Sequence, residues 1–140
     1  MEQQRNGFTI STDKMKLDLE RTHEFLAYSA YWAKGRSLDA VRKSVTHSLC
    51  FGIYKGTHQA GFARVVTDYV TFAWICDVFI LEEYRGQGLG KWLIETIVAY
   101  PELKGLKNIL LVTQDAHEMY RKYGGFEVLS VPKKWMQRAT

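Results

Sequence analysis

Hydrophobic and polar positions follow two different periods along the chain, and the period changes at turns that contain glycine or proline. Short apolar runs rich in β-branched and aromatic residues predict strands, and apolar positions three or four residues apart predict amphipathic helices. The predicted strands are 8–11, 49–55, 58–67, 70–81, 108–113 and 126–131, with a short one at 135–136. The predicted helices are 17–31, 37–48, 88–100 and 116–123. This order predicts one α/β (α+β) domain over residues 1–140, with a mixed sheet of six to seven strands flanked by about four helices.

A glycine-rich stretch joins the apolar strand at 70–81 to the helix at 88–100. Backbone N–H groups of such a loop, together with the N-terminus of the following helix, form a site for phosphate. The spacing does not fit a Walker loop, which would need glycine at Arg85 and Ser or Thr at Trp92. It also does not fit G-x-G-x-x-G, whose third glycine would fall on Lys91 or Leu93. The remaining pattern is R-x-x-G-x-G, in a loop that consists of Arg85, Gly86, Gln87, Gly88, Leu89, Gly90 and Lys91.

Composition limits the function classes. The net charge is +4 and the basic residues are scattered, which suits an anionic small molecule better than a nucleic acid. Cys50 and Cys76 lie in apolar runs and are expected to be reduced core residues. The four histidines show no ligand spacing with the cysteines, so no metal is expected. The N-terminus has no apolar signal region and no run could span a bilayer, so we expect a cytoplasmic protein without a membrane partner.

Two stretches resemble signatures of the GNAT superfamily of N-acetyltransferases. The first is the R-x-x-G-x-G loop, preceded by Asp77-Val78-Phe79-Ile80. The second begins at Asp115 and is similar to Asn-Ala-x-x-Leu-Tyr-x-Lys-x-Gly-Phe. Two departures stand out: Asp115 replaces the usual asparagine, and Gly124 adds a residue before the final glycine. The matching positions are Ala116, Tyr120, Lys122, Gly125 and Phe126.

The resemblance implies a site for acetyl-CoA between two parted central strands. Pantetheine would pair with the backbone of Phe79, Ile80 and Leu81, and the pyrophosphate would meet the amides from Arg85 to Lys91. The family's asparagine often contacts pantetheine, so Asp115 is assigned to cofactor binding, although its charge puts that contact in doubt. Asp115 is also placed to cap the helix at 116–123.

Acetyl transfer to a primary amine in a direct ternary complex requires a proton donor for the departing thiolate and a group that receives the amine's proton. The second motif implies that Tyr120 is the acid. Asp77, a carboxylate in an apolar strand, is the candidate base or amine-binding anion. The base stays open, because Asp68, Glu82, Glu83 and His117 are weaker candidates that favour solvated positions. In this fold the acceptor pocket is lined by the connection of the first two helices, which here offers Tyr31, Trp32 and Arg36.

Two other functions remain as alternatives. An acyl-CoA sensor that has lost turnover would keep the same loop, and the substituted Asp115 and the unsettled base favour it. A nucleic-acid binder would need a basic stripe, which the sequence lacks. The C-terminal strands are compatible with a homodimer, and the sequence does not identify the acceptor amine.

Overall fold

The computed structural model describes all 140 residues and has one six-stranded sheet. The strands stand in sequence order, and each pair from β1 to β5 is antiparallel, while β5 and β6 are parallel. The mixed sheet predicted from the sequence is therefore confirmed. The strands are β1 (Glu2–Arg5), β2 (Phe8–Ser11), β3 (Leu49–Lys55), β4 (His58–Thr67), β5 (Ala73–Ile80) and β6 (Ile109–Leu111).

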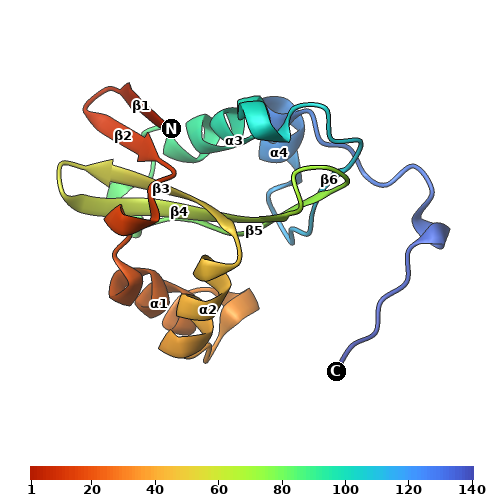
Figure 1. Ribbon diagram of the computed structural model, residues 1–140, viewed down its shortest axis with the longest axis horizontal. Coiled ribbons are helices and arrows are strands. Elements are labelled where there is room, and N and C mark those ends of the chain that lie inside the picture. Colours follow the sequence, from red (N-terminus) through yellow and green to blue (C-terminus); the bar gives the residue numbers. More distant parts are fainter.

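Four α-helices cover the two faces of the sheet (Figure 1). Helices α1 (Leu19–Tyr28) and α2 (Leu38–Thr46) lie on one face, and α3 (Leu89–Ala99) and α4 (His117–Gly124) lie on the other. Side chains of Asp18 and Ser37 cap α1 and α2 by accepting from N–H groups of the first turn. Five short 3₁₀ helices complete the chain: η1 (Lys14–Lys16), η2 (Tyr31–Ala33), η3 (Glu82–Tyr84), η4 (Pro101–Leu103) and η5 (Pro132–Lys134).

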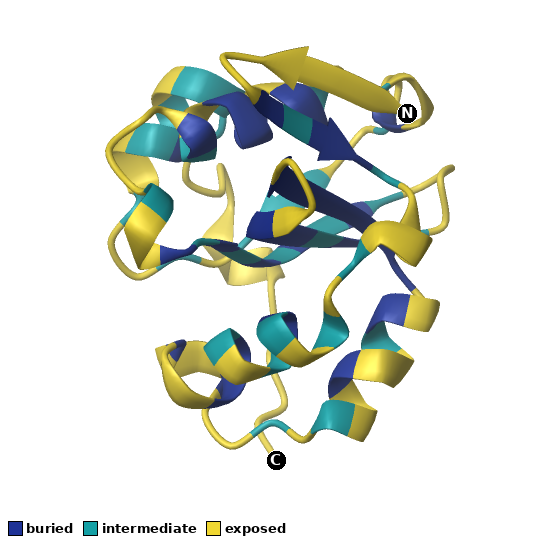
Figure 2. Ribbon diagram, turned by 90° about the vertical axis from the view of Figure 1, so that its left-hand side faces the viewer, coloured by how far each residue is buried: buried dark blue, intermediate teal, exposed yellow.

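The core consists of two separate hydrophobic clusters. The larger has 17 buried residues and joins α3 to the sheet, with Trp92, Leu93 and Ile97 among its members. The smaller has 9 buried residues, among them Leu26 of α1 and Val41 of α2. Burial is concentrated in the middle strands of the sheet and on the inner helix faces (Figure 2). Each helical layer is thus held to the sheet by its own apolar contacts.

A β-bulge at Asp77 reverses the facing of strand β5. The pairing with β4 shifts register where β5 carries one extra residue, and Asp77 has φ +52°. In an unbroken strand, residues two apart share one face. Here Ile75 belongs to the cluster under α3, whereas Phe79 belongs to the cluster under α1 and α2. Asp77 therefore lies at the point where the residues two apart along β5 change from one face of the sheet to the other.

The first and last strands differ from the sequence prediction. Strand β1 was not predicted, because all four of its residues are polar and exposed (Figure 2). It pairs with β2 through a two-residue turn at Asn6 and Gly7, both with positive φ. The predicted strands at 126–131 and 135–136 are wrong, since no strand follows β6. Phe126 still packs on the larger cluster, but the chain then leaves the body of the fold, and its apolar side chains from Val128 onward are exposed (Figure 1). The total stays within six to seven strands.

The helices are short. None of them is long and apolar enough to cross a membrane.

Candidate active site

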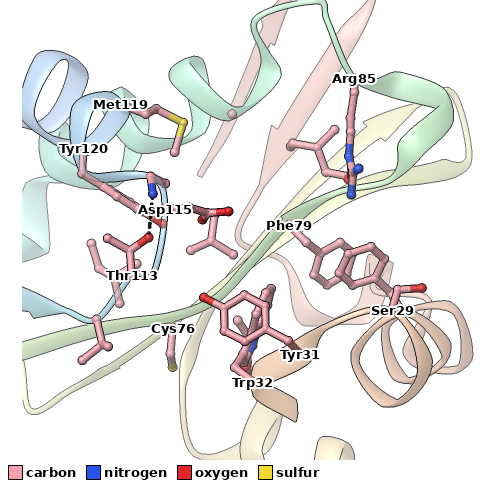
Figure 3. A pocket seen from close by; sticks show the side chains of 18 of the residues that line it. Ser29, Tyr31, Trp32, Cys76, Phe79, Arg85, Thr113, Asp115, Met119 and Tyr120 are labelled. Atoms are coloured by element: carbon pink, nitrogen blue, oxygen red, sulfur yellow. Dashed lines mark hydrogen bonds between the residues drawn. The ribbon is translucent and has the colours of Figure 1, made fainter. Parts of the chain in front are cut away.

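A cavity of about 580 Å³ opens where β5 and β6 separate. The two strands pair only from Ala73 to Ile75, and β5 continues to Ile80 with no neighbour on that side. The parted strand pair predicted from the sequence is therefore present. The side chains that line the gap come from β5, from η2 and from the segment that leads into α4 (Figure 3).

The glycine-rich loop borders this cavity through Arg85 and Gly90. Gly86 and Gly88 have φ values of +80° and +79°, which favour glycine, and Gly88 is the N-cap of α3. The backbone N–H groups from Gly86 to Lys91 have no acceptor within the chain, and the first helical bond runs from Trp92 N to Gly88 O, at 3.1 Å. Six N–H donors at a helix N-terminus fit an anionic phosphate ligand.

Arg85 is tied to the end of the central strand. Its Nε donates to the carbonyl oxygen of Ile80 at 3.0 Å, so the guanidinium is held beside the last residues of β5. Those residues, Phe79 and Ile80, line the cavity, whereas Leu81 is buried in the smaller cluster. The loop and the strand backbone assigned to the cofactor therefore meet at one end of the cavity. Their contacts with acetyl-CoA stay a prediction.

Tyr120 of α4 is buried, and its hydroxyl has no partner in the chain. The ring packs edge-on against Phe126, with 5.9 Å between the centroids. Tyr120 is 8% exposed and lines the cavity, so its hydroxyl can reach a ligand there. Burial, and to a lesser degree the nearby Tyr31, raises the pKa of Tyr120 to about 12. The phenol therefore stays protonated at neutral pH, as a proton donor must.

Asp77 is enclosed by three donors on the other side of the cavity. Its Oδ1 accepts from Trp32 Nε1 at 2.9 Å, and its Oδ2 accepts from Arg36 at 2.7 Å and from Arg64 at 2.8 Å. Burial alone would raise the pKa of Asp77, but the hydrogen bonds and charges of Arg64 and Arg36 outweigh it and hold the pKa below the ordinary value. This environment favours a fixed anion over a proton acceptor.

Stability should depend on pH through Asp77. Because its folded pKa lies below the unfolded value of about 3.9, the carboxylate contributes fully above about pH 5, and the contribution is lost as pH falls through the folded pKa. We expect the stability gap between wild type and Asp77→Asn to narrow steadily between about pH 5 and pH 2. Urea unfolding of both proteins across that range measures it, and a gap independent of pH would contradict the assignment.

The three residues assigned to the acceptor pocket divide into two groups. Tyr31 and Trp32 line the cavity from η2, with their rings edge-to-face at 5.1 Å (Figure 3). Arg36 does not line the cavity, because its guanidinium is turned to Asp77. Arg36 therefore does not contact the cavity directly. It binds Asp77 Oδ2, and the Oδ1 of the same carboxylate accepts a hydrogen bond from Trp32.

The weaker candidates for a base lie outside this cavity. Asp68 accepts from Thr71 and Val70 in an exposed turn, and these hydrogen bonds lower its pKa. Glu82 and Glu83 are exposed on η3, and Glu83 pairs with Arg21. His117 is exposed on the first turn of α4. None of these side chains lines the cavity.

Asp115 lines the cavity but does not cap α4, so the expected cap is wrong. The helix begins at an N-cap residue, Ala116, that makes no side-chain cap, and the N–H of Ala116 donates to Thr113 Oγ1 at 3.1 Å (Figure 3). The threonine hydroxyl therefore binds the N–H of the N-cap residue, and the N–H groups of the first turn have no side-chain acceptor. The carboxylate of Asp115 is left without a partner in the chain.

Sequence reasoning missed Arg64. An arginine inside the apolar run Phe62-Ala63-Arg64-Val65 is a signal, because a charge in a buried strand needs a partner. It lies across the bulge from Asp77 and also donates to Ser48 Oγ at 3.1 Å. The sequence offered no way to pair Arg64 with Asp77, since that pairing depends on the register of β4 and β5.

Comparisons with known proteins agree with this geometry. Residues 15–126 match the model of the acetyltransferase (GNAT) family. A solved structure of a GNAT-family protein from Xanthomonas campestris pv. campestris is 41% identical and covers 95% of this chain and 93% of its own, with a TM-score of 0.92. A Gibberella zeae protein named as an acetyltransferase is 29% identical, over 88% of this chain and 81% of that protein. The chain therefore belongs to the GNAT family of acetyltransferases.

The fold extends to more distant structures. A predicted acetyltransferase from Clostridium acetobutylicum, solved with acetyl-CoA, is 13% identical and covers 94% of this chain and 96% of its own, with a TM-score of 0.70. At that identity the likeness concerns the fold alone.

Proposed function

We propose that the protein transfers an acetyl group from acetyl-CoA to a primary amine in a direct ternary complex. The observation that carries the proposal is the meeting of three features around one cavity. They are a strand edge without a neighbour, a buried tyrosine hydroxyl without a partner, and a loop with six free backbone N–H groups that borders the cavity through Arg85 and Gly90. The N–H groups suit the negative charge of a diphosphate, the free strand edge suits the amides of a pantetheine arm, and the hydroxyl suits a departing thiolate.

Each group has a task in this proposal. The N–H groups from Gly86 to Lys91 bind the pyrophosphate, and the free edge of β5 at Phe79 and Ile80 pairs with pantetheine. A backbone N–H near Ile80 stabilises the oxyanion of the tetrahedral intermediate, a contact that is typically worth about 3 kcal/mol. The neutral amine nitrogen bonds to the carbonyl carbon, the carbon–sulfur bond breaks, and the thiolate takes the proton of Tyr120. The proton that the attacking nitrogen then loses passes through water and restores the phenol of Tyr120.

In this proposal Asp77 positions other residues and does not itself react. Its carboxylate fixes Trp32 of η2 and Arg36 to the bulge of β5, so it sets the wall against which the acceptor lies. Its lowered pKa makes it a poor proton acceptor. The amine is deprotonated on the exposed side of the cavity, where water reaches it.

The loop geometry gives a direct test of cofactor binding. In Gly88→Val, a β-branched side chain at φ +79° strains the turn by about 1–3 kcal/mol, so we expect acetyl-CoA to bind roughly tenfold more weakly or worse. Gly88→Asn tolerates the left-handed conformation and should bind almost as the wild type does. Calorimetry with acetyl-CoA measures both variants.

Gly105→Val is the matched control, because Gly105 also has a positive φ, of +90°, but lies in the connection that follows η4. It should lose stability and keep its affinity for acetyl-CoA. Equal affinity in Gly88→Val and the wild type would contradict the loop assignment.

The reaction itself is tested by release of free thiol from acetyl-CoA with a panel of primary amines. Binding without any thiol release would favour the alternative of a non-catalytic acyl-CoA sensor. Salt-dependent binding of DNA without binding of acetyl-CoA would favour a nucleic-acid protein. A homodimer and a cytoplasmic location stay predictions, and sedimentation would measure the first.

A further inference from the structure

The cavity has one carboxylate that nothing in the chain neutralises. Its charged lining residues are Asp77, Arg85 and Asp115. Asp77 is occupied by two arginines and an indole, and Arg85 is held by the Ile80 carbonyl. We propose that the carboxylate of Asp115, which lines the same cavity as Tyr31 and Trp32, is the site that binds the ammonium group of the acceptor. The inference rests on the proposed function, since it assigns the second substrate of the same cavity.

Asp115 makes none of the side-chain contacts that an aspartate before a helix usually makes. It makes no ion pair, and it accepts no hydrogen bond from the first turn of α4, which has no side-chain cap. The acidic side chain that pairs within α4 is Glu118, which lies against Arg121 outside the cavity. An exposed carboxylate that neither caps the helix nor pairs with a cation is free to meet a ligand.

The opposite wall suits an organic cation. Figure 3 shows Tyr31 and Asp115 reaching into the cavity from different sides. The face of a tyrosine or tryptophan ring attracts an ammonium group by about 0.5–1 kcal/mol at an exposed site. Trp32 is fixed by its hydrogen bond to Asp77, so this wall is already in place. An anion on one side and aromatic rings on the other form a site for a primary ammonium ion.

The placement of charges also separates the two substrates. Arg85 stands at the loop end, where phosphate would bind, and Figure 3 shows it well apart from Asp115. Arg36, which could have favoured an anionic acceptor, is turned away from the cavity toward Asp77. We therefore infer an acceptor whose reacting end is cationic in water and carries no neighbouring carboxylate.

Ligand binding without turnover tests this site. The probes are hexylamine, which is an ammonium ion at pH 7, and hexan-1-ol, its neutral analogue, each titrated into CoA-loaded protein by NMR. We expect hexylamine to bind wild type about fivefold more tightly than it binds Asp115→Asn, and hexan-1-ol to bind both equally weakly. Raising the salt concentration should weaken hexylamine binding to wild type and leave the variant unaffected.

Glu118→Gln removes the same charge three residues away and is the control, with hexylamine affinity unchanged. Equal hexylamine affinity in wild type and Asp115→Asn would overturn the proposal. So would a loss of acetyl-CoA affinity in Asp115→Asn without a change for hexylamine, which would place Asp115 on pantetheine. If hexylamine binds through Asp115 but no amine is acetylated, the ammonium site stands and the acetyl-transfer function fails.

Discussion

Tyr120→Phe is expected to lower turnover by about 10²–10⁴-fold while acetyl-CoA binds as it does to wild type. The change removes one oxygen from a hydroxyl that has no partner in the chain and reaches the cavity. The phenyl ring still packs against Phe126, so the fold of α4 is retained. Thiol release measures turnover and calorimetry measures affinity. Unchanged turnover would mean that water, or another group, protonates the thiolate.

The pKa of Tyr120 sharpens this test. Since it is raised to about 12, the acid should stay protonated through pH 10, and wild-type turnover should show no alkaline loss below that pH. Tyr54→Phe is the matched control, because it also removes a buried hydroxyl without a partner, but on β3, away from the cavity. Its turnover should equal that of wild type.

Asp77→Asn is expected to lower the free energy of unfolding by about 3–5 kcal/mol, the usual result of removing one partner of a buried ion pair. The carboxylate side chain is 1% exposed, and the substitution leaves Arg36 and Arg64 facing each other without a counterion. Asparagine accepts the left-handed backbone at this position, so the loss reports the charge and not the bulge. Urea unfolding measures the loss, and the melting temperature should fall by roughly 10 °C.

Two further variants test whether the loss of stability comes from the buried charges. Asp39→Asn breaks the exposed pair with Arg42 and should leave stability unchanged. A double variant, Asp77→Asn with Arg64→Met, removes one stranded cation and should recover part of the loss. If Asp77→Asn is as stable as wild type, the hydrogen bonds of Asp77 to Trp32, Arg36 and Arg64 do not contribute to stability.

Local patterns in the sequence were sufficient for most of the fold. Strands β3 and β4 have the predicted bounds, because their apolar runs end at charged residues and a Gly56 turn. Strand β1 was missed, since its residues are all polar and its pairing depends on the Asn6-Gly7 turn alone. The segment 126–131 has the composition of a strand but forms no ladder, and composition does not show whether a neighbouring edge is within reach.

The position of the candidate site was predictable where its residues are contiguous in the chain. The loop from Arg85 to Lys91 and Tyr120 each belong to a motif of neighbouring residues, and both motifs border the cavity. The partners of Asp77 do not, because Trp32, Arg36 and Arg64 meet it only through the bulge and the packing of η2. The free state of Asp115 was also hidden, since the helix begins one residue later than predicted, with Ala116 as its N-cap.

The two apolar clusters have a consequence for how relatives of this protein can diverge. The aromatic wall belongs to the helical layer that rests on the cluster of 9, and the glycine loop leads into the layer that rests on the cluster of 17. Mutations in one layer disturb few side chains of the other, so their free-energy effects should be nearly additive. Selection can therefore remodel the aromatic wall of η2 while the glycine-rich loop, which leads into the other layer, keeps its geometry.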